Sequence, residues 1–243
     1  MNLRRAGFPH GFSTRVGGVS EEPFASLDFG AGSDPERVAE NVRRFAAAAG
    51  FEPQALRQVK QVHGARAIDA AAMRDDPAAR EDADALFLAP KTMSHARAVG
   101  IRVADCVPIL VATRDRGEIA AIHAGWRGVA AGIVGVCLTE LEGTDRIAAI
   151  GPCIGACCFE VGAEVVPQVV RAAGGDEAVV ARREGEKAYL DLRRAVRRQL
   201  ERAGVGEVED VAGCTRCDAA LFFSYRRDGA QSGRHLAAIA LRP

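Results

Sequence analysis

Three short apolar segments near the middle of the chain limit most strongly what it can fold into. They span residues 98–103, 107–112 and 118–123 and are rich in Val and Ile. Segments of this length and composition, only a few residues apart, are typical of β-strands. The third ends at His123 and is followed at once by AGWRG, so a polar side chain stands where a buried strand meets a tight turn. The sequence therefore predicts a strand-rich centre with a histidine at its edge.

Segments on both sides of this centre predict helices and further strands. The clearest helix covers residues 34–49, where Asp34 can cap the first turn, Pro35 suits that turn and Gly50 ends it. Other helices are predicted over 129–142, 164–173 and 191–203, and other strands over 146–150, 208–212, 221–225 and 236–241. Because helices and strands alternate irregularly, the pattern favours a mixed α/β or α+β fold over a regular doubly wound sheet.

Charge gives no reason to expect a nucleic acid or a membrane as partner. Lys and Arg number 32 and are balanced by 32 Asp and Glu. The longest uncharged apolar segment, 129–138, is too short to span a bilayer, and the first residues lack the apolar core of a secretory signal. The predicted helix 191–203 carries four arginines that we expect to form a solvated face: Arg193, Arg194, Arg197 and Arg198.

Length and cysteine content define the class of protein further. A chain of 243 residues without a repeat or a linker is expected to form a single domain over residues 1–243. Its seven cysteines are odd in number and irregularly spaced, which indicates reduced thiols rather than a disulfide framework. We therefore expect a cytoplasmic protein, and a monomer in the absence of a visible exposed apolar segment.

Three residues are candidates for a metal site because each stands where a strand-like segment meets a break. They are His63, Cys106 and His123. Two imidazoles and a thiolate suit zinc, and three protein ligands leave the fourth position open for water or substrate. Asp105 is a candidate carboxylate behind these ligands. From spacing alone, a core cysteine with two hydrogen-bonded histidines is favoured over a metal site.

The remaining cysteines also allow two interpretations. Cys153, Cys157, Cys214 and Cys217 form a C-x3-C and C-x2-C pattern that suits a structural zinc site, but a buried cysteine commonly serves packing alone. Cys137 and Cys158 are expected to serve packing.

Several arginines lie beside glycines, a combination that suits an anion or a carboxylate ligand. Each of them can instead bridge loops. Trp126 can stack on a flat ring or belong to the core. The arginines in question are Arg15, Arg127, Arg226, Arg227 and Arg234.

Six segments of the sequence together resemble motifs of the laccase-domain family. They are HGFSTRVGGVS (10–20), KQVHG (60–64), ADCVPIL (104–110), HAGWRG (123–128), IGPCIGACCFEVG (150–162) and FFSYRRDGAQSGR (222–234). That family was first described as polyphenol oxidoreductases and is now regarded as purine nucleoside phosphorylases. The resemblance runs from about residue 7 to the end of the sequence, which implies one laccase-type domain over 1–243.

The resemblance implies a fold, a metal and a reaction. The fold is a layered sandwich of mixed sheets flanked by helices, similar to cysteine hydrolases. His63, Cys106 and His123 bind one catalytic zinc ion, and Ser13, Thr14, Arg15 and Arg127 are candidates to contact phosphate or ribose. The reaction is phosphorolysis of adenosine, inosine, guanosine and methylthioadenosine to the base and ribose 1-phosphate, with adenosine deamination as a second activity. Some bacterial members are described as peptidoglycan editing factors.

Three other functions remain open at this stage. A copper-dependent polyphenol oxidase uses two histidines and a cysteine with a weak axial Met, but Met1, Met73 and Met93 lie in no motif and five histidines are few for several copper ions. A metal-independent hydrolase or amidase of peptidoglycan quality control would use Cys106 as nucleophile and His123 as base. A non-enzymatic binding module would hold a ligand without turning it over.

Overall fold

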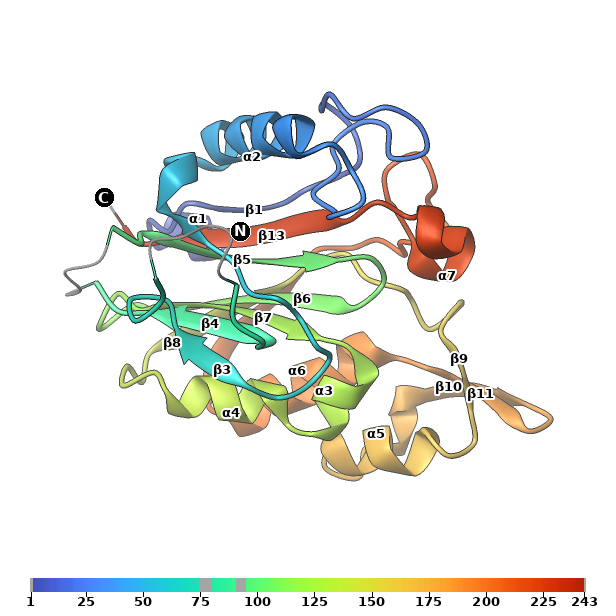
Figure 1. The fold of residues 1–243 in the computed structure, drawn as a ribbon. Coiled ribbons are helices and arrows are strands. Elements are labelled where there is room, and N and C mark those ends of the chain that lie inside the picture. The colour runs from blue at the N-terminus through green and yellow to red at the C-terminus, as the bar shows by residue number, and fades with distance from the viewer. Residues whose placement is uncertain (1, 75–79, 91–94, 243) are drawn as a thin grey trace.

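The centre of the molecule is a six-stranded mixed sheet, seen edge-on in Figure 1. The computed structural model describes residues 2–74, 80–90 and 95–242. Every residue of the two middle strands, β6 (Val107–Thr113) and β7 (Ile119–Ala124), is buried, which explains their continuous apolar sequence. The strand order is β12 (Val205–Asp210), β8 (Arg146–Ile150), β6, β7, β4 (Ala85–Leu88) and β3 (Ala67–Asp69).

A four-stranded sheet packs on one face of this centre. Its order is β1 (His10–Phe12), β13 (His235–Ala240), β5 (Ala98–Val103) and β2 (Leu56–Arg57). Apolar residues of both sheets form a common core, with Ile101 and Ile239 facing Leu110 and Ile119. Helix α2 (Pro35–Ala49) covers the outer face of the four-stranded sheet (Figure 1).

Helices cover the other face of the six-stranded sheet and complete a sandwich of four layers (Figure 1). They are α3 (Trp126–Ala130), α4 (Ile133–Thr139), α5 (Val166–Ala172) and α6 (Leu192–Arg202). A small antiparallel sheet of β10 (Val180–Glu184), β11 (Lys187–Leu190) and β9 (Glu160–Gly162) lies beside them. The short elements are α1 (Asn2–Arg5), α7 (Tyr225–Asp228), and the 3-10 turns η1 (Pro53–Ala55), η2 (Glu177–Val179) and η3 (Gly229–Gln231). The mixed α/β fold predicted from the sequence is confirmed.

The central strands and the first long helix follow the sequence closely. The strands predicted over 98–103 and 146–150 have those bounds. The bounds of the strands predicted over 107–112 and 118–123 differ from those of β6 and β7 by one residue. Asp34 caps α2, since its side chain accepts hydrogen bonds from the backbone N–H groups of Glu36 and Arg37. The helix predicted over 129–142 is instead two helices, α3 and α4, because Gly132 adopts a left-handed conformation with φ 78° between them.

One prediction about the C-terminal third is wrong. Residues 221–225 form no strand: the Phe222 N–H donates to the Asp218 carbonyl in a turn, and Ser224 then caps α7. The arginines of α6 do lie on a partly exposed face, and in addition they have partners in neighbouring segments. Arg194 and Arg198 bind Asp176, Arg197 binds Asp210, and Arg193 donates to the carbonyls of Val211 and Gly213.

Among the described residues, the helices are too short or too polar for any of them to cross a bilayer.

Asp34→Ala is expected to lower the free energy of unfolding by about 1 kcal/mol, because two N–H groups at the start of α2 lose their acceptor. Urea denaturation measures this change. Asp34→Asn keeps an acceptor oxygen and is the matched control, so an equal loss in both variants would contradict the capping role.

Candidate metal centre and active-site cavity

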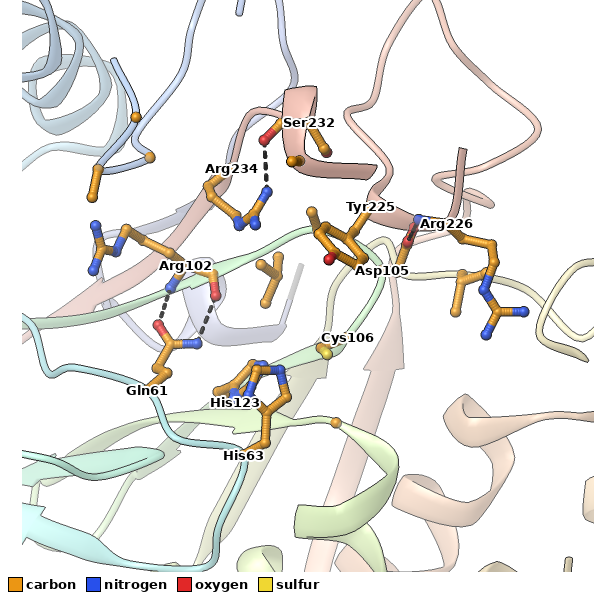
Figure 2. A pocket seen from close by; sticks show the side chains of 18 of the residues that line it. Gln61, His63, Arg102, Asp105, Cys106, His123, Tyr225, Arg226, Ser232 and Arg234 are labelled. Carbon is orange, nitrogen blue, oxygen red and sulfur yellow. Dashed lines mark hydrogen bonds between the residues drawn. The ribbon is translucent and has the colours of Figure 1, made fainter. Parts of the chain in front are cut away.

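A cavity of about 790 Å³ opens where the ends of β5, β6 and β7 meet the C-terminal loops. This volume suits a small organic ligand. Figure 2 shows that His63, Cys106 and His123 lie together on one side of it, with Arg102 and Arg234 on another. The cavity is lined by residues from five parts of the chain, namely 24–32, 60–63, 102–106, 123–127 and 225–234, together with Ile154, Phe159 and Leu192.

The side chains of His63, Cys106 and His123 form one group, here called the histidine–cysteine group. Their potential ligand atoms all lie within 4.8 Å of one another, and the two imidazole rings are edge to face with centroids 4.9 Å apart. Antiparallel pairing of β6 with β7 places Cys106, just before β6, beside the end of β7. Gly125 leaves room for the group, because a Cβ there would lie 3.1 Å from the Cys106 sulfur and 3.2 Å from the His63 ring.

The backbone is strained on both sides of this group. His63 has φ 60° and Asp105 has φ 85°, and they are the two residues other than glycine with positive φ in the described part of the chain. Such conformations cost free energy and persist where surrounding contacts enforce them, as they commonly do at functional sites. The strain therefore supports a functional role for the group.

Asp84 holds the histidine–cysteine group in this arrangement, although it was not among the residues expected from the sequence. Its fully buried carboxylate accepts hydrogen bonds from His123 Nδ1 at 2.7 Å and from the backbone N–H groups of His63 and Gly64 at 2.9 and 2.7 Å. With Nδ1 bound to Asp84, Nε2 of His123 remains available to a ligand. The available signal was an aspartate directly before the apolar strand β4.

Asp105 does not have the role expected from the sequence. Its carboxylate accepts from the Thr215 hydroxyl and from the Arg226 N–H, both at 2.6 Å, so it is directed to the loop that carries these residues. Asp84 supplies the carboxylate behind the group instead.

Charge within the group favours a thiolate. Burial alone would raise the pKa of Cys106, but the positive charge of His123 and hydrogen bonds from His123 and His63 hold it below its ordinary value. Burial would likewise lower the pKa of His123, while Cys106 and Asp84 raise it. Without a metal, the group is therefore a thiolate–imidazolium pair supported by Asp84. A thiolate is the form that binds metal ions or attacks a carbonyl.

Three of the candidate substrate residues, Ser13, Thr14 and Arg15, are absent from the described lining of the cavity. The guanidinium of Arg15 donates to the carbonyls of Ala25 and Ala219 and therefore bridges two loops. The buried Ser13 hydroxyl accepts from the Leu236 N–H at 3.0 Å. Ser13, Thr14 and Arg15 are thus absent from the described lining, because their loop serves the packing of the four-stranded sheet.

The other arginines divide between the two interpretations. Arg127, Arg226 and Arg234 line the cavity as expected for ligand contacts, whereas Arg227 donates to the carbonyls of Phe222 and Thr215. Trp126 also lines the cavity, with the Arg127 guanidinium 4.4 Å above its ring.

Arg102 also lines the cavity, although it was not among the candidate residues from the sequence. Its signal there was a single charged residue within the apolar strand β5. Burial first, and then repulsion from Arg80 and Arg234, lower its pKa to about 10. The nearby Asp28 carboxylate already accepts from the N–H groups of Gly30 and Arg234. An anion bound at Arg102 would relieve this repulsion.

The second group of cysteines in the structure differs by one residue from the pattern expected from the sequence. The sulfurs of Cys157, Cys158, Cys214 and Cys217 lie within 4.8 Å of one another and are here called the four-cysteine group. Cys158 replaces Cys153, which is buried in the core and receives a hydrogen bond from Arg193. Cys137 is buried in the core, as expected.

The described residues provide little for copper chemistry. Met73 is buried between the sheets, and Met1 and Met93 lie outside the described residues. His10 and His235 hydrogen-bond within the fold, to the Phe8 carbonyl and the Phe223 N–H. In the described part of the chain, histidines join a potential metal site only at His63 and His123.

Comparison with known proteins now adds the family. Residues 9–242 match the family model described as multi-copper polyphenol oxidoreductase laccase. The chain belongs to this laccase-domain family. The resemblance inferred from the motifs is therefore confirmed.

Relatives within the laccase-domain family cover almost the whole chain. A protein of Deinococcus radiodurans named purine nucleoside phosphorylase is 43% identical over 240 residues, which cover 96% of this chain and 89% of that protein. Purine nucleoside phosphorylase YfiH of Escherichia coli is 35% identical, with 89% of this chain and 87% of that protein covered. The crystal structure of YlmD from Geobacillus stearothermophilus superposes with a TM-score of 0.85 at 34% identity, covering 98% of this chain and 93% of that one.

In metal-free protein, Cys106 is expected to react with iodoacetamide at a lower pH than an ordinary cysteine, whose pKa is about 8.5. The physical reason is its lowered pKa, and Cys137, whose pKa burial raises to about 12, is the internal comparison. Peptide mapping by mass spectrometry measures both rates as a function of pH.

Asp84→Asn should move the Cys106 profile to higher pH, because the imidazolium of His123 loses its partner. Asp82→Asn is the matched control, since Asp82 is exposed and pairs with Lys60. A Cys106 profile centred at or above that of free cysteine would show that no thiolate is stabilised.

Proposed function

We propose that this protein is a purine nucleoside phosphorylase that uses one zinc ion held by His63, Cys106 and His123. The observation that carries the proposal is the position of these three side chains at a cavity that is also lined by two half-buried arginines, Arg102 and Arg234. The names of the relatives support the same activity.

The donor set fits zinc. Two imidazoles and a thiolate are ligands that zinc prefers, and three protein ligands leave one position for substrate. Asp84 holds the His123 ring in the orientation that exposes Nε2, as carboxylates behind zinc ligands do. When bound, the ion supplies a Lewis acid at the cavity wall.

The chain's own residues would bind and orient the substrates. Arg102 and Arg234 provide the positive charge that phosphate requires, and Arg102 has donors beyond the one it uses on the Phe29 carbonyl. Trp126 and Tyr225 offer aromatic faces to a purine at the same cavity.

In the proposed reaction, a phosphate oxygen forms a bond to C1′ of the ribose while the glycosidic bond to the purine breaks. The base leaves with the electron pair of that bond and takes up a proton. Holding the two reactants side by side supplies much of the rate enhancement, because the reaction needs positioned phosphate more than a protein nucleophile.

Adenosine, inosine, guanosine and methylthioadenosine are the proposed substrates, since all share the ribosyl–purine bond. Adenosine deamination is a proposed second activity of the same site, in which water replaces the amino group of the purine and ammonia is released.

A cysteine hydrolase is the second candidate, favoured by one specific observation. Cys106, His123 and Asp84 lie in the order of a nucleophile, a base and an orienting carboxylate. Such an enzyme would cleave an amide, as expected for peptidoglycan quality control, and would work without metal.

Turnover of inosine and adenosine with and without phosphate separates these functions. The phosphorylase releases base only with phosphate, whereas a deaminase releases ammonia from adenosine without it. Cys106→Ser and His123→Ala are expected to lower kcat/KM about 100-fold or more, because each removes a ligand of an ion worth several kcal/mol to the transition state.

Full phosphate-dependent base release by both variants would disprove the proposal. Metal-independent amide cleavage with covalent labelling of Cys106 would favour the hydrolase.

Arg102→Met is expected to raise KM for phosphate about 10- to 100-fold, the effect of one charge-assisted hydrogen bond, with little change in KM for inosine. Steady-state kinetics with each substrate varied in turn measures the split. Arg114→Met is the control, because Arg114 is a surface residue paired with Asp145 and Glu207. An equal rise in both KM values would contradict phosphate binding at Arg102.

A further inference from the structure

The four-cysteine group is separate from the cavity and has no part in the proposed reaction. We propose that Cys157, Cys158, Cys214 and Cys217 bind one structural zinc ion in a closed tetrahedral site. This inference does not depend on which reaction the cavity performs, because none of the four cysteines is among the described residues that line it.

The distances between the sulfurs fit a single ion. The Cys157 sulfur lies 3.6 Å from those of Cys214 and Cys217, and the Cys158 sulfur lies 3.3 Å from that of Cys217. A tetrahedron of thiolates around zinc at about 2.3 Å has edges of about 3.8 Å. The sulfurs are much farther apart than the roughly 2.05 Å of a disulfide. They are also too close together to enclose a cluster of several irons and sulfides.

The two loops that carry the cysteines are fastened to each other. Cys153 and Cys214 form an isolated β-bridge, and the Thr215 N–H donates to the Cys153 carbonyl at 3.1 Å. Cys157 and Cys158 are neighbours in sequence, yet both reach the group because they lie in a turn rather than a strand. The ligand positions are therefore preformed, which lowers the entropic cost of binding an ion.

Hydrogen bonds and charge around the sulfurs favour thiolates over thiols. The Gly155 N–H donates to the Cys214 sulfur at 3.2 Å, and the Arg216 guanidinium donates to the Cys158 sulfur at 3.5 Å. A divalent ion would offset part of the negative charge of four thiolates, and Arg216 would offset more of it.

The same loops support the backbone beside Cys106. Thr215 and Arg226 donate to the Asp105 carboxylate at 2.6 Å each, and the Ile154 N–H donates to the Asp105 carbonyl at 2.9 Å. An ion that joins the loops 155–158 and 214–217 would thus fasten the wall of the cavity behind Asp105. Four protein ligands leave no position for substrate, so the ion is structural.

Metal analysis of the full chain, purified without chelator under reducing conditions, tests the site. The Cys157→Ser/Cys217→Ser variant is expected to hold one zinc ion per chain fewer than the unchanged protein. Cys137→Ala is the matched control, because it removes a buried cysteine outside the group and should leave the zinc content unchanged.

The His63→Ala/His123→Ala variant distinguishes zinc bound by the four-cysteine group from metal bound at the cavity. It should retain the ion of the four-cysteine group whether or not the cavity binds metal, so failure of one site does not imply failure of the other. Unchanged zinc content in the cysteine variant, or iron in place of zinc, would overturn the inference.

A second measurement uses the unchanged protein and therefore does not depend on whether a variant folds. Cys157 and Cys217 are exposed, yet bound zinc should make them resist alkylation in the native protein until a chelator is added. Rapid alkylation of both before chelation would overturn the inference. So would an intact mass that shows disulfides within the group.

Discussion

The site depends on one buried carboxylate. Asp84 accepts from His123 Nδ1 and from two N–H groups of the 63–64 loop, and its own carbonyl accepts from the His123 N–H at 2.8 Å. A carboxylate with no exposed surface is costly to bury unless such donors surround it. The same four hydrogen bonds therefore satisfy Asp84 and fix the His123 ring and the backbone of His63. The His123 imidazole cannot turn away without removing the side-chain donor of this buried carboxylate.

Around this anchor the fold separates two kinds of charge. Cys106 and His123 lie at one wall of the cavity, with Asp84 behind His123, while Arg102 and Arg234 lie at another wall (Figure 2). Backbone hydrogen bonds position both walls. Asp84 accepts from the N–H groups of residues 63 and 64. The Gln61 side chain makes two hydrogen bonds of 2.7 Å with the backbone of Arg102. Both walls thus connect to the segment 60–64, so a change in that loop would move the histidine–cysteine group and Arg102 together.

The sequence predicted best what a segment decides by itself. The strand 98–103 and the cap at Asp34 need only local apolar pattern and local acceptors. The convergence of His63, Cys106 and His123 was implied by the family resemblance of their motifs, because spacing alone did not establish it. The sequence could not reveal Asp84, whose partners lie about 20 and 39 residues away. Nor could it reveal the ion pairs of the α6 arginines, because Asp176 and Asp210 reach them from other elements.

The position of β13 in the four-stranded sheet affects how the protein must be made. This strand lies between β1 and β5, and the contact of Ser13 with Leu236 joins residues 223 positions apart. During synthesis, β1 and β5 therefore leave the ribosome with open edges long before the strand that pairs with both. The arginine wall of the cavity, which includes Arg234, is assembled only in that last step. A nascent chain released early would lack both a closed sheet and the Arg234 side of the cavity.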